Sequence, residues 1–127
     1  MNPVVPISWG ELLDRVTILE IKAERLAGAA ARQNVAQELA LLGAAADAAL
    51  RDPAVAALKA ELKKVNETLW TIEDEIRARE AQQLFDAEFI RLARSVYRTN
   101  DERGRLKREI NRLLGSEITD EKQYTEY

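Results

Sequence analysis

The sequence contains no cysteine and no histidine, and it has only 5 glycines and 3 prolines among 127 residues. Without cysteine the chain forms no disulfide and no thiolate metal site. Without histidine it lacks the commonest general base and the commonest metal ligand. These absences exclude many enzyme classes and favour a protein that is not an enzyme. We expect no catalytic residue, no metal site and no cofactor.

Long hydrophobic runs are also missing. No apolar stretch approaches the roughly 20 residues that a membrane-spanning helix needs. The apolar start, MNPVVPI, carries no basic residue and is interrupted by Pro3 and Pro6, so it does not resemble a secretory signal peptide. We therefore expect a soluble cytoplasmic protein without a membrane partner.

The residues that are abundant favour helix. Hydrophobic residues make up 46% and charged residues 32% of the chain, and Ala, Leu, Glu and Arg dominate. A chain of this length fits one domain with a core of its own. We predict an all-α protein with a single helical domain over 1–127, a short extended segment over 1–7 and a polar tail over 116–127.

Capping signals divide the chain into four expected helices. The first begins at Trp9 behind a capping box formed by Ser8 and Glu11, and it ends before Gly28. Asn34 is expected to cap a second, Ala-rich helix. The third begins at Asp52-Pro53, and the fourth begins behind Asp86 and ends at Gly115.

The third expected helix has a regular apolar stripe. Its residues are spaced 4, 3, 4, 3 and 4 apart: Leu58, Leu62, Val65, Leu69, Ile72 and Ile76. This spacing is typical of a heptad seam. The fourth helix begins with the same spacing at Phe89, Leu92 and Val96, but the seam then meets Thr99 and Arg103 before it resumes at Leu106. We predict a helical bundle built on a long antiparallel coiled-coil-like hairpin with a polar layer midway.

This polar layer is the first candidate site. Polar groups held between helices cost free energy unless they find partners. They therefore either satisfy one another in a layer that fixes the helix register, or bind a small molecule or an anion. The candidate ligand-binding residues are Asn66, Trp70, Glu73, Arg77, Tyr97, Asn100 and Arg103.

The fourth helix is also basic on its outer side. Eight basic and three acidic residues lie between Arg91 and Arg112, a local net charge of +5. Pairs four residues apart, such as Asp101 with Arg105, counter much of this charge. We expect a solvated salt-bridge face; docking of the acidic tail or of an acidic protein is the alternative, and nucleic acid is not the expected partner.

The first expected helix is apolar on two sides, so it requires two partners. It either lies at the centre of its own bundle or gives one stripe to another subunit, as in a homodimer. The candidate interface residues on this second stripe are Asp14, Ile18, Ile21 and Arg25.

Four segments of the chain carry a family resemblance: PISWGELLDRVTILEIKAERL, LKKVNETLWTIEDEIR, VYRTNDERGRLKREIN and EKQY. With them, nearly the whole chain resembles a family of small bacterial proteins catalogued as a domain of unknown function. The resemblance implies a bacterial, intracellular, all-helical protein and supplies no activity. The region from Ala27 to about Ala57 matches least well.

A second resemblance covers only ELLDRVTILEIKAERL, which looks like the first helix of the all-helical chorismate mutases. It implies that Arg15, Lys22 and Arg25 bind an anion, although their spacing differs from that family's pattern and no second basic set follows. Taken together, these features favour a non-enzymatic scaffold or adaptor that binds a partner protein or itself. The alternatives are a protein that binds a small ligand or anion between the third and fourth helices, and a chorismate-mutase-like enzyme.

Overall fold

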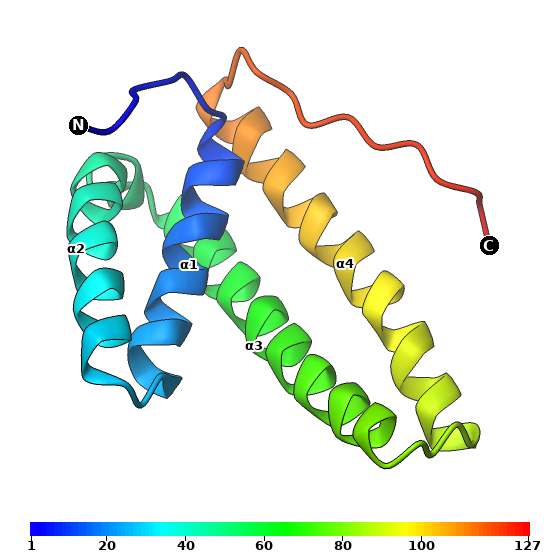
Figure 1. Cartoon of the computed structure of the whole chain (residues 1–127). Coiled ribbons are helices and arrows are strands. Elements are labelled where there is room, and N and C mark those ends of the chain that lie inside the picture. The colour runs from blue at the N-terminus through cyan, green and yellow to red at the C-terminus, as the bar shows by residue number, and fades with distance from the viewer.

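The computed structural model describes all residues, 1–127, and is all-helical. Its elements are α1 (Trp9–Arg25), α2 (Ala29–Ala46), a 3-10 turn (Ala49–Arg51), α3 (Pro53–Ala81) and α4 (Ala87–Leu114). Figure 1 shows α3 and α4 as a long antiparallel pair, with α1 lying across the end far from their connecting turn and α2 beside α1. The predicted all-α bundle is confirmed, while the coiled-coil geometry of α3 and α4 stays a prediction.

Three of the predicted helix boundaries are confirmed by their caps. The Asp52 carboxylate accepts a hydrogen bond from the Ala54 amide at 2.9 Å, and Asp86 accepts from the Phe89 amide at 3.1 Å. Gly115 ends α4 with a φ of 63°, a left-handed conformation that glycine adopts without steric cost. None of the helices combines the length and apolar character that crossing a membrane requires.

The boundary between α1 and α2 differs from the prediction. Gly28 has a φ of −70° and forms the N-cap of α2, so it is not a left-handed stop for α1. Asn34 lies inside α2, which begins at Ala29. Alanine has the highest helix propensity of all residues, so the Ala-rich stretch extends the helix ahead of the expected cap.

The core lies where α1 crosses α3 and α4. Leu12, Leu13 and Val16 of α1 pack with Leu62 of α3 and Leu106 of α4, and all five side chains are buried. Helix α1 contacts all three other helices, which cover its first apolar stripe and Ile21 of the second, while Ile18 of the second stripe stays half-buried. Helix α1 therefore lies centrally within its own bundle, and the contribution of its second stripe to another subunit stays a prediction.

The start of α1 is fastened to the end of α4. The Ser8 hydroxyl accepts from the Glu11 amide at 3.1 Å, as the capping box predicts. Asn111 Oδ1 accepts from the Gly10 amide at 2.6 Å, and Ser116 Oγ accepts from the Trp9 amide at 3.0 Å. Amides of the first helical turn that would lack partners are thus satisfied by residues near the other end of the chain.

The reciprocal hydrogen bond of the predicted capping box, from the Ser8 amide to the Glu11 carboxylate, is wrong. The Glu11 carboxylate accepts from Lys107 Nζ at 2.7 Å in place of the Ser8 amide.

Beyond Gly115 the tail turns back and runs beside α4 in extended conformation, as Figure 1 shows.

Candidate functional site

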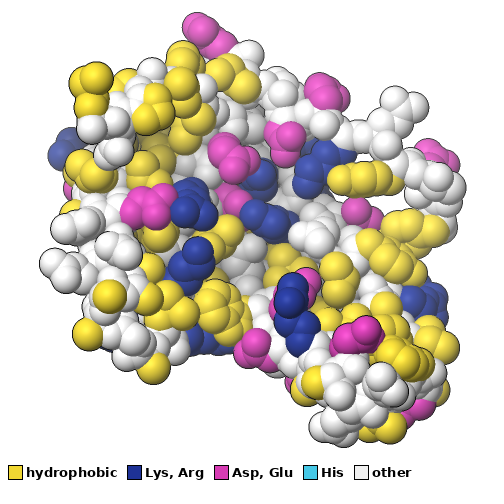
Figure 2. Space-filling model, in the orientation of Figure 1, with side chains coloured by type: hydrophobic (Ala, Val, Ile, Leu, Met, Phe, Trp, Pro, Cys, Tyr) yellow, Lys and Arg dark blue, Asp and Glu magenta, His cyan; other side chains and the backbone are white.

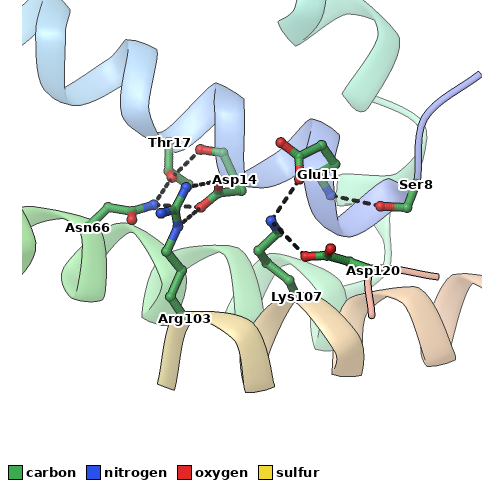
Figure 3. Close-up of polar contacts among 8 residues, drawn as sticks. All are labelled: Ser8, Glu11, Asp14, Thr17, Asn66, Arg103, Lys107 and Asp120. Atoms are coloured by element: carbon green, nitrogen blue, oxygen red, sulfur yellow. Dashed lines mark hydrogen bonds and ion pairs between the residues drawn. The ribbon is translucent and has the colours of Figure 1, made fainter. Parts of the chain in front are cut away.

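A buried carboxylate joins α1, α3 and α4. Asp14 of α1 is 1% exposed and accepts two hydrogen bonds from the Arg103 guanidinium of α4, at 2.9 Å from Nε and 2.5 Å from Nη2. Asn66 Nδ2 of α3 donates to Asp14 Oδ1 at 2.9 Å and to Thr17 Oγ1 at the same distance. Figure 3 shows these side chains pointing toward one point between the helices. We call these residues, Asp14, Thr17, Asn66 and Arg103, the polar junction.

The surroundings of Asp14 keep it ionised. Burial by itself raises the pKa of Asp14, but the hydrogen bonds from Arg103 and Asn66 and the charges of Arg103 and Lys107 outweigh it and hold that pKa below 3.8. The pKa of Arg103 is raised by its hydrogen bonds with Asp14. A carboxylate and a guanidinium that are locked as ions in this way fix geometry and do not exchange protons near neutral pH.

This lowered pKa makes stability depend on pH. In acid the unfolded chain takes up a proton at Asp14 before the folded chain does, so the contribution of Asp14 is present above pH 3.8 and is lost as pH falls through the lower folded pKa. We expect the free energy of unfolding to fall with pH below about 4 more gradually in Asp14→Asn than in wild type. Urea melts between pH 2 and 6 measure this, and identical slopes would contradict it.

A second ion cluster lies one turn further along α4. Lys107 Nζ is 2.7 Å from Glu11 Oε2 of α1 and 3.6 Å from Asp120 Oδ2 of the tail, and its side chain is only 7% exposed. Figure 3 shows it between the two carboxylates. The charge of Lys107 therefore holds the start of α1 and the beginning of the tail against α4.

An open groove of about 460 Å³ lies beside the polar junction. Six of the seven predicted ligand-binding residues line it: Asn66, Trp70, Glu73, Arg77, Asn100 and Arg103. Ile18 and Ile21, predicted as interface residues, also line it, together with Leu69 and Asp74. Two surfaces that the sequence suggested separately therefore meet in one groove between α1, α3 and α4.

The sequence supports a family assignment. Residues 3–127 match a family described as a family of unknown function, DUF6165. The chain belongs to this family. It matches no curated protein and no solved structure. The predicted resemblance to a small all-helical family of unknown function is confirmed, and the DUF6165 description assigns no activity.

Three predicted site residues of this DUF6165 protein need correction in position. Asp14 and Ile21 are each 1% exposed, so the chain's own helices cover them and neither is available to a second subunit. Tyr97 lies outside the groove and faces the tail. Of the predicted interface residues, Ile18 remains half-buried, and Arg25 lies 5.8 Å from the centre of the Trp70 ring.

The arginines of α4 pair differently from the prediction. Glutamates three residues earlier, and not partners four residues away, hold three of them: Glu88–Arg91, Glu102–Arg105 and Glu109–Arg112. The bridge predicted between Asp101 and Arg105 does not form. Figure 2 shows that basic and acidic side chains also lie next to one another around α1, in the middle of the displayed face. Pairs of this kind at the surface contribute little stability but reduce the field available to a polyanion.

The basic residues of α1 do not converge on one point. Arg15 forms a two-pronged ion pair with Glu38 of α2, with Nε and Nη2 at 3.0 and 2.9 Å from Oε1. Arg25 lies against α3, with Nη2 3.9 Å from Glu67 Oε2. The anion-binding set implied by the chorismate mutase resemblance is therefore not assembled by these side chains.

Sequence reasoning missed part of the polar junction and of the Lys107 cluster. Thr17 and Lys107 were not predicted as functional, and Asp14 was predicted only at an interface. Their signal was available, because each is a polar residue on an otherwise apolar helix side and such residues need a partner. The identity of that partner required the three-helix geometry.

Proposed function

We propose that this DUF6165 protein is a non-enzymatic protein-binding module whose groove receives a segment of a partner protein. The observation that carries this proposal is the convergence of Ile18, Trp70, Asn100 and Arg103 in one open groove whose wall is fixed by the polar junction. A wall held by the Asp14–Arg103 ion pair has little conformational freedom to lose on binding, which favours recognition.

Binding is favoured over catalysis by the state of the charged groups. Asp14 is satisfied by Arg103 and Asn66, and its lowered pKa makes it a poor general base near neutral pH. Glu73 is engaged by Arg77, with Nε 3.1 Å from Oε2. These groups shape and polarise a surface, and none is poised for proton transfer.

The free groups of the groove define the chemistry of the partner. Ile18, Leu69 and Trp70 are partly exposed and offer an apolar seat for one side chain. Asp74 is exposed and forms no ion pair, so it is the unpaired charge of the groove. We therefore propose a partner segment that presents an apolar side chain next to a lysine or arginine.

Affinity purification from the native host tests the groove. We expect partners recovered with wild type to be lost with Asp74→Lys, which reverses the free charge, and with Ile18→Lys, which places a charge in the apolar seat. Lys64→Glu is the matched control, since Lys64 is exposed on α3, away from the groove. With the purified partner, Asp74→Lys is expected to weaken binding about tenfold or more. Equal recovery by all three variants would reject the groove.

A second copy of the chain is the first partner to test. Light scattering across a range of concentrations measures the mass of wild type. If the groove binds a second copy, the mass doubles at high concentration and Ile18→Lys returns it to that of the monomer. A monomer at all concentrations removes the homodimer and leaves a different protein as the partner.

A small anionic ligand in the same groove is the second candidate. It is favoured by two hydrogen-bond donors without partners. Arg103 directs Nε and Nη2 to Asp14, so its Nη1 has no partner in the chain. The side-chain amide of Asn100 forms no hydrogen bond either. Thermal shift against a panel of anions tests it with Asn100→Asp as the variant. A shift in wild type that Asn100→Asp abolishes supports this candidate, and a flat panel rejects it.

We further propose that the protein acts in the bacterial cytoplasm, as its sequence features and family resemblance predict. The extensive pairing of the α4 arginines supports the absence of a nucleic-acid partner.

A further inference from the structure

All three tyrosines of the chain gather at one place. Tyr97 lies on α4, whereas Tyr124 and Tyr127 lie on the tail, yet all three line a pocket of about 630 Å³ between α4 and the tail. Small-ligand sites are typically of this size, roughly 300 to 1,000 Å³. The pocket adjoins the groove only at Asn100, which lines both.

Specific contacts close the tail over α4. The Tyr127 hydroxyl donates a hydrogen bond to Asp101, and the Tyr127 ring meets the Tyr97 ring edge-on, with centroids 5.2 Å apart and planes at 70°. The Asp101 carboxylate raises the pKa of Tyr127, since it stabilises the protonated hydroxyl. Rings set at a steep angle to each other form two adjoining walls of a cage.

The charges that line this pocket favour a cation. Asp101 and Glu126 contribute carboxylates, and tyrosine rings attract cations over their faces. No basic side chain of the protein lies over a tyrosine ring, because the single cation–π contact in the structure is that of Arg25 with Trp70. The tyrosine faces that the Tyr97–Tyr127 pair does not use therefore carry no cation of the chain and can receive one from outside.

The opposing charges lie to one side. Lys122 lines the pocket, but its amino group is directed toward Gly104, 3.9 Å from the point where a Cβ of that residue would lie. Arg98 is close enough to lower the pKa of Tyr127 slightly, against the larger effect of Asp101. Neither cation covers a tyrosine face.

We propose that the three tyrosines and the two carboxylates bind a small quaternary ammonium compound. Two carboxylates among aromatic rings are too few ligands for a metal ion, and the structure contains no group of three or more acidic residues arranged to hold one. A trimethylammonium group suits the pocket because its methyl groups pack on the rings while its charge is attracted by their faces.

An NMR titration of the full chain with choline chloride tests the site. We expect saturable shifts of the backbone amide signals of Tyr97, Asp101, Tyr124 and Tyr127, with sodium chloride at equal concentration as the reference. The uncharged isostere 3,3-dimethylbutan-1-ol has the same shape as choline without the charge. Its affinity is therefore expected to be at least about tenfold lower. Equal binding of the isostere, or no saturable shift with choline, would overturn the proposal.

Substitution of Tyr124 separates the cage from the fold. Tyr124 is exposed and forms no hydrogen bond or ring pair within the chain, so its truncation is expected to leave folding intact. We expect Tyr124→Ala to weaken choline binding about fivefold to tenfold and Tyr124→Phe, which keeps the aromatic face, to weaken it less than about twofold. Wild-type affinity in Tyr124→Ala would show that the ring does not contact the ligand and would overturn the cage.

Discussion

Arg103→Met is expected to lower the free energy of unfolding by about 3 to 5 kcal/mol, the range found when one partner of a buried ion pair is removed. Methionine keeps the length of the side chain but leaves Asp14, only 1% exposed, without its two charged hydrogen bonds. Asn66 alone then donates to the carboxylate. Urea denaturation followed by circular dichroism at pH 7 measures the loss.

Two further variants make this expectation specific. Arg108→Met changes an exposed arginine of the same helix that forms no ion pair, so it is expected to alter stability by no more than about 0.5 kcal/mol. Asp14→Leu combined with Arg103→Met removes both charges and is expected to be less destabilising than Arg103→Met alone. A loss below about 1 kcal/mol in Arg103→Met would mean that water reaches Asp14 and that the polar junction does not fix the groove.

Gly10→Ala is expected to destabilise the protein by about 3 kcal/mol, although alanine normally stabilises a helix by roughly 1 kcal/mol relative to glycine. A Cβ at Gly10 would lie 2.4 Å from the backbone oxygen of Lys107 and 2.9 Å from Asn111 Oδ1. Backbone on the facing helix cannot move aside as a side chain end can, so α1 must shift away from α4. Thermal and urea melts measure the change.

Gly43→Ala provides the matched control for this expectation. Gly43 lies within α2, and nothing is within 4 Å of the point where its Cβ would lie. There the substitution is expected to stabilise the protein by about 0.5 to 1 kcal/mol. Destabilisation by Gly10→Ala together with stabilisation by Gly43→Ala identifies close helix contact at Gly10. Stabilisation by both substitutions would show that α1 and α4 are not in contact there.

Helix boundaries could be predicted from the sequence where a single residue determines them. Local chemistry places the N-caps Asp52, before Pro53, and Asp86, whose carboxylates accept from free helix amides. It also places Gly115, which ends α4, and all three lie where expected. Gly28 and Asn34 misled the prediction because each fits more than one role, and a run of alanines decided between them. Local signals are reliable when no competing propensity surrounds them.

The candidate site could be predicted in part. Arg103 interrupts an apolar seam and Asn66 borders one, which indicated that both need partners. The carboxylate that accepts their hydrogen bonds is Asp14, which is 52 positions from Asn66 and 89 from Arg103 in the chain. Only the crossing of α1 over α3 and α4 brings it near them. Spacing along one helix indicated which residues need partners, but it could not place a third helix against them.

The place of Tyr97 beside the tail could not be predicted from the sequence. It was predicted to bind ligand together with Trp70 and Asn100, yet its neighbours in space are Tyr124 and Tyr127. The tail has no apolar periodicity from which its path could be inferred. Its return along α4 depends on single contacts such as Asp120 with Lys107.

The fastening of α1 by Asn111 and Ser116 has a consequence for the order of events during synthesis. Helix α1 is translated first, but its polar anchors at Asn66, Arg103, Lys107 and Asn111 leave the ribosome much later. The α3–α4 hairpin, built from nearer contacts, can form before α1 docks, since short loops close at lower entropic cost. A nascent chain that lacks the last turns of α4 therefore holds an unanchored, two-sided apolar helix, the stage at which this protein would depend most on chaperones.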